Sequence, residues 1–332
     1  MNIFITGEKG FIAQNIKKEA EKSFKDFKII TGAVDYLNMH KVGEPCVYKN
    51  SIEQWEFFFR LNKVDVIIHN AAFVGTDVVA LNAQDSTSTN VEGTYNIARA
   101  AKKCNIPVCY MGTTVIYDTP KYQETKITEK SDRGPNTLYG CQKLAAEHIV
   151  MSQTSKWMIV RPLFAYGGEG DMNSLIAKSI YAALNNVDNV DMFLDPEKIK
   201  DYMHVSDYAN AVLTAIIKDL WFDDWNVAAE TPYTTLDIVK TVERECNLNL
   251  SKVINWHPQT DYMGNHRLSS RKFRKAADWH PKMDLISGIK DSFSTIVTAK
   301  SYNPLTYLEE ANTKGIDLTE FFNEDRIART TI

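Results

Sequence analysis

A tyrosine and a lysine four positions apart, Tyr139 and Lys143, are the residues of this chain whose types and spacing could do chemistry. On a helix, this spacing places two side chains about one turn apart on the same face. A lysine ammonium beside a phenol favours the phenolate, and such a tyrosine can exchange a proton with an alcohol or a ketone near neutral pH. Because helix surfaces also produce this spacing by chance, the interpretation depends on the elements that position the pair.

The first of these elements is the N-terminal stretch, which predicts a strand, a glycine turn and a helix. Residues 2–6 read as a buried strand, Gly7 and Gly10 lie in the turn, and residues 13–24 read as a helix. This is the context that a dinucleotide-binding fingerprint requires. Gly7 permits the tight turn, Gly10 lets the backbone approach a pyrophosphate, and the helix N-terminus supplies N–H groups for it. The alternative is a strand-turn-helix that is simply rich in glycine.

The second predicted strand, residues 27–31, leaves the choice between NAD and NADP open. A carboxylate at its end would bind the ribose 2′-hydroxyl of NAD, whereas an arginine there would suit the phosphate of NADP. Here Thr31 and Gly32 occupy the end, and Asp35 follows four residues after Thr31. Lys9, inside the glycine turn, could meet a 2′-phosphate or remain a solvated surface residue. We therefore keep both cofactors, with a slight preference for NADP.

Two further strands end in residues suited to a ligand. Residues 64–69 form a clear buried strand, and the small residues Ala71 and Ala72 follow it closely. The strand at residues 107–111 is followed by hydroxyl side chains, Thr113 and Thr114 among them. In open α/β sheets, ligands bind at the carboxyl ends of the strands. These segments therefore predict the binding edge of a parallel sheet.

The composition excludes several classes of function. The 332 residues carry a net charge of -4 and no long basic run, so neither nucleic acid nor an anionic membrane is an expected partner. No apolar stretch approaches the ~20 residues of a membrane span. The five cysteines are scattered without a Cys-x-x-Cys pair, so we expect no metal site and a reduced, cytoplasmic setting.

The motifs, taken in order, resemble an extended short-chain dehydrogenase/reductase of the nucleotide-sugar epimerase/dehydratase type, over roughly residues 1–300. The motifs are Thr6-Gly7-x-x-Gly10-x-x-Ala13, Asn70-Ala71-Ala72, Asn90-Val91-x-Gly93-Thr94, Gly112-Thr113-Thr114-Val115-Ile116-Tyr117, Tyr139-x-x-x-Lys143, Arg161-Pro162 and Tyr202-Met203-His204-Val205-x-Asp207. The late Asp278-Trp279-His280-Pro281-Lys282 is similar to the Gly-Trp-x-Pro-x turn of this family.

The resemblance implies a role for each matching residue. Tyr139 would be the general acid/base, Lys143 would bind the nicotinamide ribose and lower the tyrosine pKa, and Thr113 would hydrogen-bond the reacting oxygen. Hydride would pass between the nicotinamide and a sugar carbon, most often C4 of a hexose. The expected cofactor contacts are Gly7, Lys9, Gly10, Phe11, Ile12, Asn70, Ala71, Ala72, Asn90, Tyr139, Lys143 and Pro162. The expected substrate contacts are Thr114, Phe164 and Arg267.

Departures from the family pattern narrow the reaction. The 4,6-dehydratases carry Asp-Glu where this chain has Thr114-Val115, and neither residue here can move a proton from the sugar. Epimerase-reductases of the fucose-synthase type have a catalytic cysteine in place of Val115. Many members have a diphosphate-binding asparagine where this chain has Phe164. What remains is redox at one carbon, with a nucleotide-sugar 4-epimerase as the first hypothesis and an NADPH-dependent reductase of a keto sugar or another small carbonyl compound as the second.

The resemblance also implies the architecture. We expect an α/β fold in which residues 1–165 form a Rossmann-type doubly wound parallel sheet that binds NAD(P). Residues 166–300 would mainly form a smaller C-terminal α/β substrate domain, with residues 201–220 returning to the first domain. Residues 301–332 have mixed polarity and no assigned role.

Two expectations concern assembly and activity. The family usually dimerises through two long helices, here around residues 88–104 and 139–153, so we expect a homodimer. From another class, the fold could serve as a cofactor-binding subunit without turnover. Such relatives usually lose the tyrosine or the lysine, whereas this chain keeps both Tyr139 and Lys143.

Overall fold

The computed structural model describes residues 1–31, 51–168, 170–171, 174–184, 190–250, 254–258 and 263–298. Gly32, Asp35 and the C-terminal extension at 301–332 lie outside these ranges. Among the residues described, no helix combines the length and the apolar character that crossing a bilayer requires.

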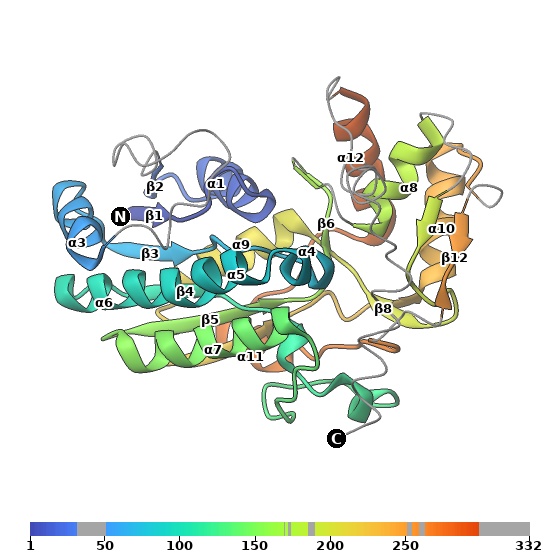
Figure 1. The fold of residues 1–332 in the computed structure, drawn as a ribbon. Helices are drawn as coiled ribbons and strands as arrows, with labels where there is room; N and C mark the ends of the chain where they lie inside the picture. The colour runs from blue at the N-terminus through green and yellow to red at the C-terminus, as the bar shows by residue number, and fades with distance from the viewer. Residues whose placement is uncertain are drawn as a thin grey trace, which may run out of the picture.

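Within the described residues, six parallel strands form the central sheet, in the order β10-β5-β4-β3-β1-β2. Figure 1 labels β1 to β5 of this sheet. Their bounds are β1 (Asn2–Ile5), β2 (Lys28–Ile30), β3 (Val66–His69), β4 (Val108–Met111), β5 (Trp157–Pro162) and β10 (Asp223–Val227). This confirms the predicted doubly wound parallel sheet. The outer strand β10 comes from beyond residues 201–220, so the part of the chain that returns to the sheet is longer than predicted.

Alternating side chains of the strands build a hydrophobic core on each face of the sheet. Ile3 and Ile5 of β1 face one core, and Phe4 faces the other. The first core is covered by α1 (Phe11–Ser23), α9 (Val205–Ile217) and α11 (Arg271–Ala277). The second is covered by α3 (Ile52–Leu61), α6 (Thr94–Cys104) and α7 (Leu138–Gln153). The side chains of Tyr139 and Lys143 are therefore carried by a helix packed directly on the sheet.

A separate core lies beside the sheet, where Figure 1 shows α8, α10 and α12 together. Its helices are α8 (Leu175–Leu184), α10 (Thr235–Cys246) and α12 (Leu285–Thr298). Its short strands pair as β7 (Val190–Met192) with β12 (Ile254–Trp256), and as β8 (Ile199–Asp201) with β11 (Pro232–Thr234). The strands β6 (Ala165–Tyr166) and β9 (Met203–His204) pair where this part meets the sheet.

The helix predicted over residues 88–104 contains a change of helical type. α4 (Thr76–Leu81) and α5 (Ala83–Thr87) precede a π-helical turn, η1 (Ser88–Gly93), which runs into α6. The sequence signals a helix here but not the wider turn. Such turns are rare within α-helices and are frequent at functional sites.

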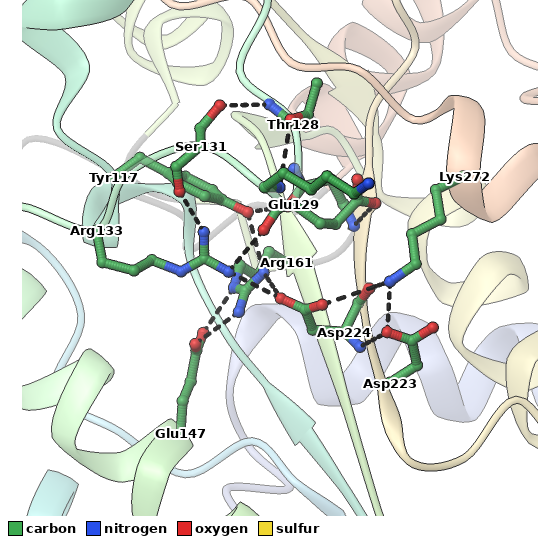
Figure 2. Close-up of polar contacts among 12 residues, drawn as sticks. Tyr117, Thr128, Glu129, Ser131, Arg133, Glu147, Arg161, Asp223, Asp224 and Lys272 are labelled. Carbon is green, nitrogen blue, oxygen red and sulfur yellow. Dashed lines mark hydrogen bonds and ion pairs between the residues drawn. The ribbon is translucent and has the colours of Figure 1, made fainter.

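A buried ion pair joins the sheet to α7 (Figure 2). Arg161 of β5 donates from Nε and Nη2 to the two carboxylate oxygens of Glu147, at 2.8 and 2.7 Å, and their side chains are 2% and 1% exposed. Gly112 lies directly against the pair, because a Cβ there would sit 2.8 Å from both Arg161 Cγ and Glu147 Oε1. Since Glu147 lies one turn beyond Lys143, this pair fixes how α7 sits on the sheet.

The network continues to the outer strand β10. Arg161 Nη1 donates to Asp224 Oδ2 at 2.5 Å and to the Tyr117 hydroxyl at 2.9 Å, and Arg133 also donates to Asp224 at 2.9 Å. Lys272 of α11 pairs with Asp223 and donates to the backbone oxygen of Asp224 (Figure 2). The buried guanidinium therefore has acidic partners on both sides, as a buried charge requires.

We predict that Glu147→Gln destabilises the protein by about 3 kcal/mol, because it leaves the buried Arg161 charge without its bidentate partner. Urea unfolding monitored by circular dichroism measures this loss. The matched control is Glu56→Gln, which removes the partner of Arg60 in an exposed pair on α3 and should leave the midpoint nearly unchanged. Equal midpoints for the two variants would contradict the role given to the buried pair.

Candidate active site

The first turn of α7 is closely fitted to the turn after β4. Thr137 caps the helix, its hydroxyl accepting from the Gly140 N–H at 3.1 Å. A Cβ at Gly140 would lie 2.7 Å from Pro135 Cβ and 2.9 Å from the Val115 carbonyl oxygen. The absence of a side chain at Gly140 therefore lets the helix approach residues 114–116 closely, and Tyr139 is placed beside that turn.

Lys143 is buried against the end of β4. Its ammonium donates to the Met111 carbonyl oxygen at 2.7 Å and lies 4.2 Å from the centre of the Tyr110 ring. Burial lowers the pKa of Lys143 to about 7, against the opposing effect of the Glu147 carboxylate. The lysine can therefore change its charge with modest changes in its surroundings, such as a bound anion or a phenolate.

Thr113 and Thr114 follow Met111 closely. Thr113 caps the 3-10 turn η2 (Thr114–Ile116), its hydroxyl accepting from the Val115 N–H at 3.4 Å. Thr113 is 8% exposed and Thr114 is 2% exposed. The helix α7, which carries Tyr139 and Lys143, thus lies with its first turn against the turn after β4 that carries Thr113, at the edge where a parallel sheet binds its ligands.

The glycine turn is built to take a ligand close to its backbone. Gly7 has φ +68, and a Cβ there would lie 2.9 Å from Ala71 Cα. The Thr6 hydroxyl accepts from the N–H groups of Asn70 and Ala71 at 3.0 and 2.9 Å, which holds residues 70–72 against the turn. Gly10 is the N-cap of α1 and offers no side-chain cap, so the first N–H groups of the helix fit a pyrophosphate.

His69 belongs to the core. It is 1% exposed, and its ring nitrogens lie 2.8 Å from the Thr6 hydroxyl and 3.0 Å from the Thr94 hydroxyl. Burial, with Lys143 as the second cause, lowers the pKa of His69 to about 3, so the imidazole is neutral. It joins the glycine turn to α6 rather than taking part in proton transfer.

The remaining predicted cofactor contacts differ in their surroundings. Lys9 is exposed, and Phe11 and Ile12 are half-buried in the first turn of α1. Pro162 is the last residue of β5. Asn90 is 1% exposed, and its side-chain amide bonds to Phe73 and Gln142, so its hydrogen bonds are made within the protein.

An aromatic cluster surrounds Phe164, one of the predicted substrate contacts. This residue has φ +32, an uncommon conformation for a non-glycine residue, and its ring stacks on Tyr202 with centroids 5.4 Å apart. His266 meets the same ring edge-on at 5.7 Å and is fully buried, with neither ring nitrogen hydrogen-bonded within the described residues. Arg267, the other predicted substrate contact, donates from Nη2 to the Gln123 carbonyl oxygen at 3.1 Å.

Three residues that support the site were not singled out from the sequence: Glu147, Tyr110 and Gln142. Glu147 and Lys143 are four positions apart, so their helical spacing was a usable signal for a shared face. Nothing local in the sequence marks Arg161 as the partner of Glu147 or the Tyr110 ring as the surface beneath Lys143.

Several characterised proteins are similar to this chain in sequence. A dTDP-D-glucose 4,6-dehydratase of Dictyostelium discoideum is 26% identical over 267 residues, covering 72% of this chain and 61% of that protein's own length. A dTDP-glucose 4,6-dehydratase of Haemophilus influenzae is 24% identical, covering 73% of this chain and 78% of the relative. The match to the Dictyostelium protein therefore leaves more than a third of that protein unmatched.

Solved structures share the fold. A dTDP-glucose 4,6-dehydratase of Bacillus anthracis in complex with NAD superposes with a TM-score of 0.76 at 21% identity, covering 91% of this chain and 98% of the other. A UDP-glucose 4-epimerase of Thermotoga maritima with UDP-glucose gives 0.75 at 20% identity, covering 90% and 99%. A Pseudomonas aeruginosa protein complexed with NADPH gives 0.76 at 16% identity, covering 89% and 98%.

The family model described as the NAD dependent epimerase/dehydratase family matches residues 3–228, which is most of the chain. The matched region contains the glycine turn, the end of β4, and the Tyr139–Lys143 pair whose geometry is given above. This chain belongs to the NAD-dependent epimerase/dehydratase family of extended short-chain dehydrogenase/reductase enzymes.

Proposed function

We propose that this enzyme is a nucleotide-sugar epimerase that acts by oxidation and reduction at one carbon of the sugar, C4 of a hexose. The observation that supports the proposal is the close fit of α7, which carries Tyr139 and Lys143, on the end of β4 and the turn that carries Thr113. The cofactor supplies a reversible hydride acceptor at this edge.

Three residues have separate roles in proton transfer and in binding. Tyr139 takes the hydroxyl proton as hydride leaves the sugar, and it returns the proton when the resulting ketone is reduced from the other side. Thr113 hydrogen-bonds the reacting oxygen. Lys143, whose ammonium donates to the Met111 carbonyl oxygen at 2.7 Å, would bind the nicotinamide ribose and support the phenolate form of Tyr139. This positioned proton transfer contributes on the order of 10²–10⁴ to the rate.

Dehydration does not fit these residues, although the two sequence relatives named above are dehydratases. Loss of water from a sugar after oxidation needs a second acid/base beside the ring. The positions that carry Asp-Glu in such enzymes are Thr114 and Val115 here, in the turn η2. A threonine and a valine cannot exchange that proton near neutral pH.

A reductase that releases NADP is the second candidate. It is favoured by the end of β2, where Thr31 follows Ile30 without a carboxylate, and by the exposed Lys9 in the glycine turn. A carboxylate at this place selects the ribose hydroxyl of NAD. Solved relatives of this fold bind NAD or NADPH, so the fold itself is compatible with either cofactor.

We also propose a homodimer that uses α6 and α7. A surface hollow over η1, α6 and α7 is lined by the apolar side chains of Val91, Tyr95 and Ile149 together with the polar Glu92 and Asn96, and Tyr95 is 42% exposed. Apolar side chains gathered on a helix pair are suited to burial against a second copy. A monomeric mass in light scattering would rule this out.

Tyr139→Phe should lower kcat by a factor on the order of 10²–10⁴, because the variant keeps the ring but removes the proton-exchanging hydroxyl. Cofactor affinity, measured by fluorescence titration, should stay within about threefold, since the glycine turn is untouched. The assay uses UDP- and dTDP-hexoses and follows conversion at C4. Unchanged turnover would sink the catalytic assignment.

The dinucleotide released from denatured enzyme separates the two candidates. An epimerase needs its hydride returned in each cycle, so we expect stoichiometric NAD(H) in the mass spectrum of the supernatant. A protein purified empty that then binds added NADPH more tightly than NADH would instead support the reductase. The Tyr139→Phe protein, denatured in the same way, is the control that shows whether the dinucleotide stays bound when there is no turnover.

The stability of the cofactor-free protein should depend on pH through Lys143. Its folded pKa is about 7 and its ordinary value is 10.5, so between these values the unfolded chain holds a proton that the folded protein has released. Raising the pH through this window should therefore favour the folded state by up to about 1.4 kcal/mol per unit. The contribution of Lys143 is measured as the difference in unfolding free energy between wild type and Lys143→Met at each pH. If the two plots of unfolding free energy against pH were parallel, this prediction would be contradicted.

A further inference from the structure

Gln142 lies between the two reactive residues of α7, and its side chain is committed to another element. It is 3% exposed. Its amide nitrogen lies 3.0 Å from Ser86 Oγ and 2.9 Å from Thr87 Oγ1, donating to both, and its oxygen accepts from Asn90 Nδ2 at 2.9 Å. These three hydrogen bonds fix how α7 lies relative to residues 86–90, because each buried polar atom must keep its partner.

Asn90 carries the contact onward to the loop that follows β3. Its Oδ1 accepts from the Phe73 N–H at 2.8 Å, and its Nδ2 also donates to the Phe73 carbonyl oxygen at 3.1 Å. Phe73 directly follows Asn70-Ala71-Ala72, the segment held against the glycine turn by Thr6. Two consecutive side-chain amides thus connect α7 to the loop beside the expected cofactor path.

The π-helical turn places Asn90 for this contact. Asn90 lies in η1, where the backbone is wider than in the α-helices on both sides. The Thr94 hydroxyl donates to the Asn90 carbonyl oxygen at 2.7 Å, and the same hydroxyl lies 3.0 Å from His69 Nε2. Both the backbone and the side chain of Asn90 are therefore held by buried groups, which makes the turn a fixed part of the site.

We propose that Gln142 is a positioning residue of the redox site, which holds Tyr139 and Lys143 in register with the cofactor loop through Asn90. The inference rests on the proposed redox function of that pair. A misplacement of about 1 Å in a reacting group can cost on the order of a hundredfold in rate. A residue that only adds stability would instead change the unfolding midpoint and leave kcat of the folded enzyme alone.

The test is Gln142→Met, which keeps the side-chain length and removes its hydrogen bonds. We expect kcat to fall about tenfold or more, with KM and cofactor Kd within about threefold of wild type. The matched control is Gln153→Met, eleven residues further along α7, where Arg99 of α6 donates to the amide oxygen at 3.3 Å. That variant should keep the wild-type kcat. A kcat for Gln142→Met within twofold of wild type would overturn the proposal.

A second pair of variants covers the case in which Gln142→Met does not fold. Thr87 is exposed, so substitutions there do not disturb the core. Thr87→Val removes one hydrogen bond to Gln142 and should lower kcat about two- to threefold, whereas Thr87→Ser keeps the hydroxyl and should match wild type. Equal kcat values for valine and serine would count against the proposal.

A readout without substrate separates this inference from the proposed function. The circular dichroism of the nicotinamide band of bound reduced cofactor reports how firmly the ring is held. We expect a weaker band for Gln142→Met than for wild type and Gln153→Met. This difference would support the positioning role even if no nucleotide sugar is turned over, and identical bands in all three proteins would overturn it.

Discussion

The buried pair of Arg161 and Glu147 is the constraint on which the rest of the site depends. A guanidinium and a carboxylate in the interior are tolerated when their hydrogen bonds are satisfied in good geometry, and moving either one exposes an uncompensated charge to a nonpolar surrounding. Glu147 therefore allows α7 one angular setting on the sheet. Lys143, one turn earlier, then reaches the Met111 carbonyl oxygen, and Gly112 leaves the room that the pair needs.

Features that depend on residues close together in the sequence could be predicted from it. The strand, glycine turn and helix at the N-terminus, the parallel strands and the Tyr139–Lys143 pair each depend on short-range spacing, and the structure contains all of them. The π turn η1 could not be predicted, because its residues are compatible with an ordinary helix. The addition of β10 to the sheet could not be predicted either, because segments of the separate core lie between β5 and β10 in the sequence.

The proposed redox side and the proposed substrate side of the site differ in how much can be inferred from the motifs of the family. The redox side consists of backbone contacts and small residues, such as Gly7 against Ala71, which any member with this cofactor geometry can share. On the proposed substrate side, Phe164 stacks on Tyr202 and meets the buried His266 edge-on, so its setting depends on several side chains at once. Residue roles there cannot be transferred one at a time from relatives at about a quarter identity.

The outer strand β10 makes the central sheet depend on residues from a late part of the sequence. It pairs with β5 and places Asp224 against Arg161, yet residues of the separate core lie before it in the sequence. A shortened chain that stopped at residue 165 would leave β5 as an open sheet edge and the guanidinium without one of its acids. Residues 1–165 alone therefore do not contain the complete sheet, and during synthesis the sheet can be completed only after residue 227 has been translated. Gene fusions or exchanges between relatives must therefore place their boundary at another position than residue 165.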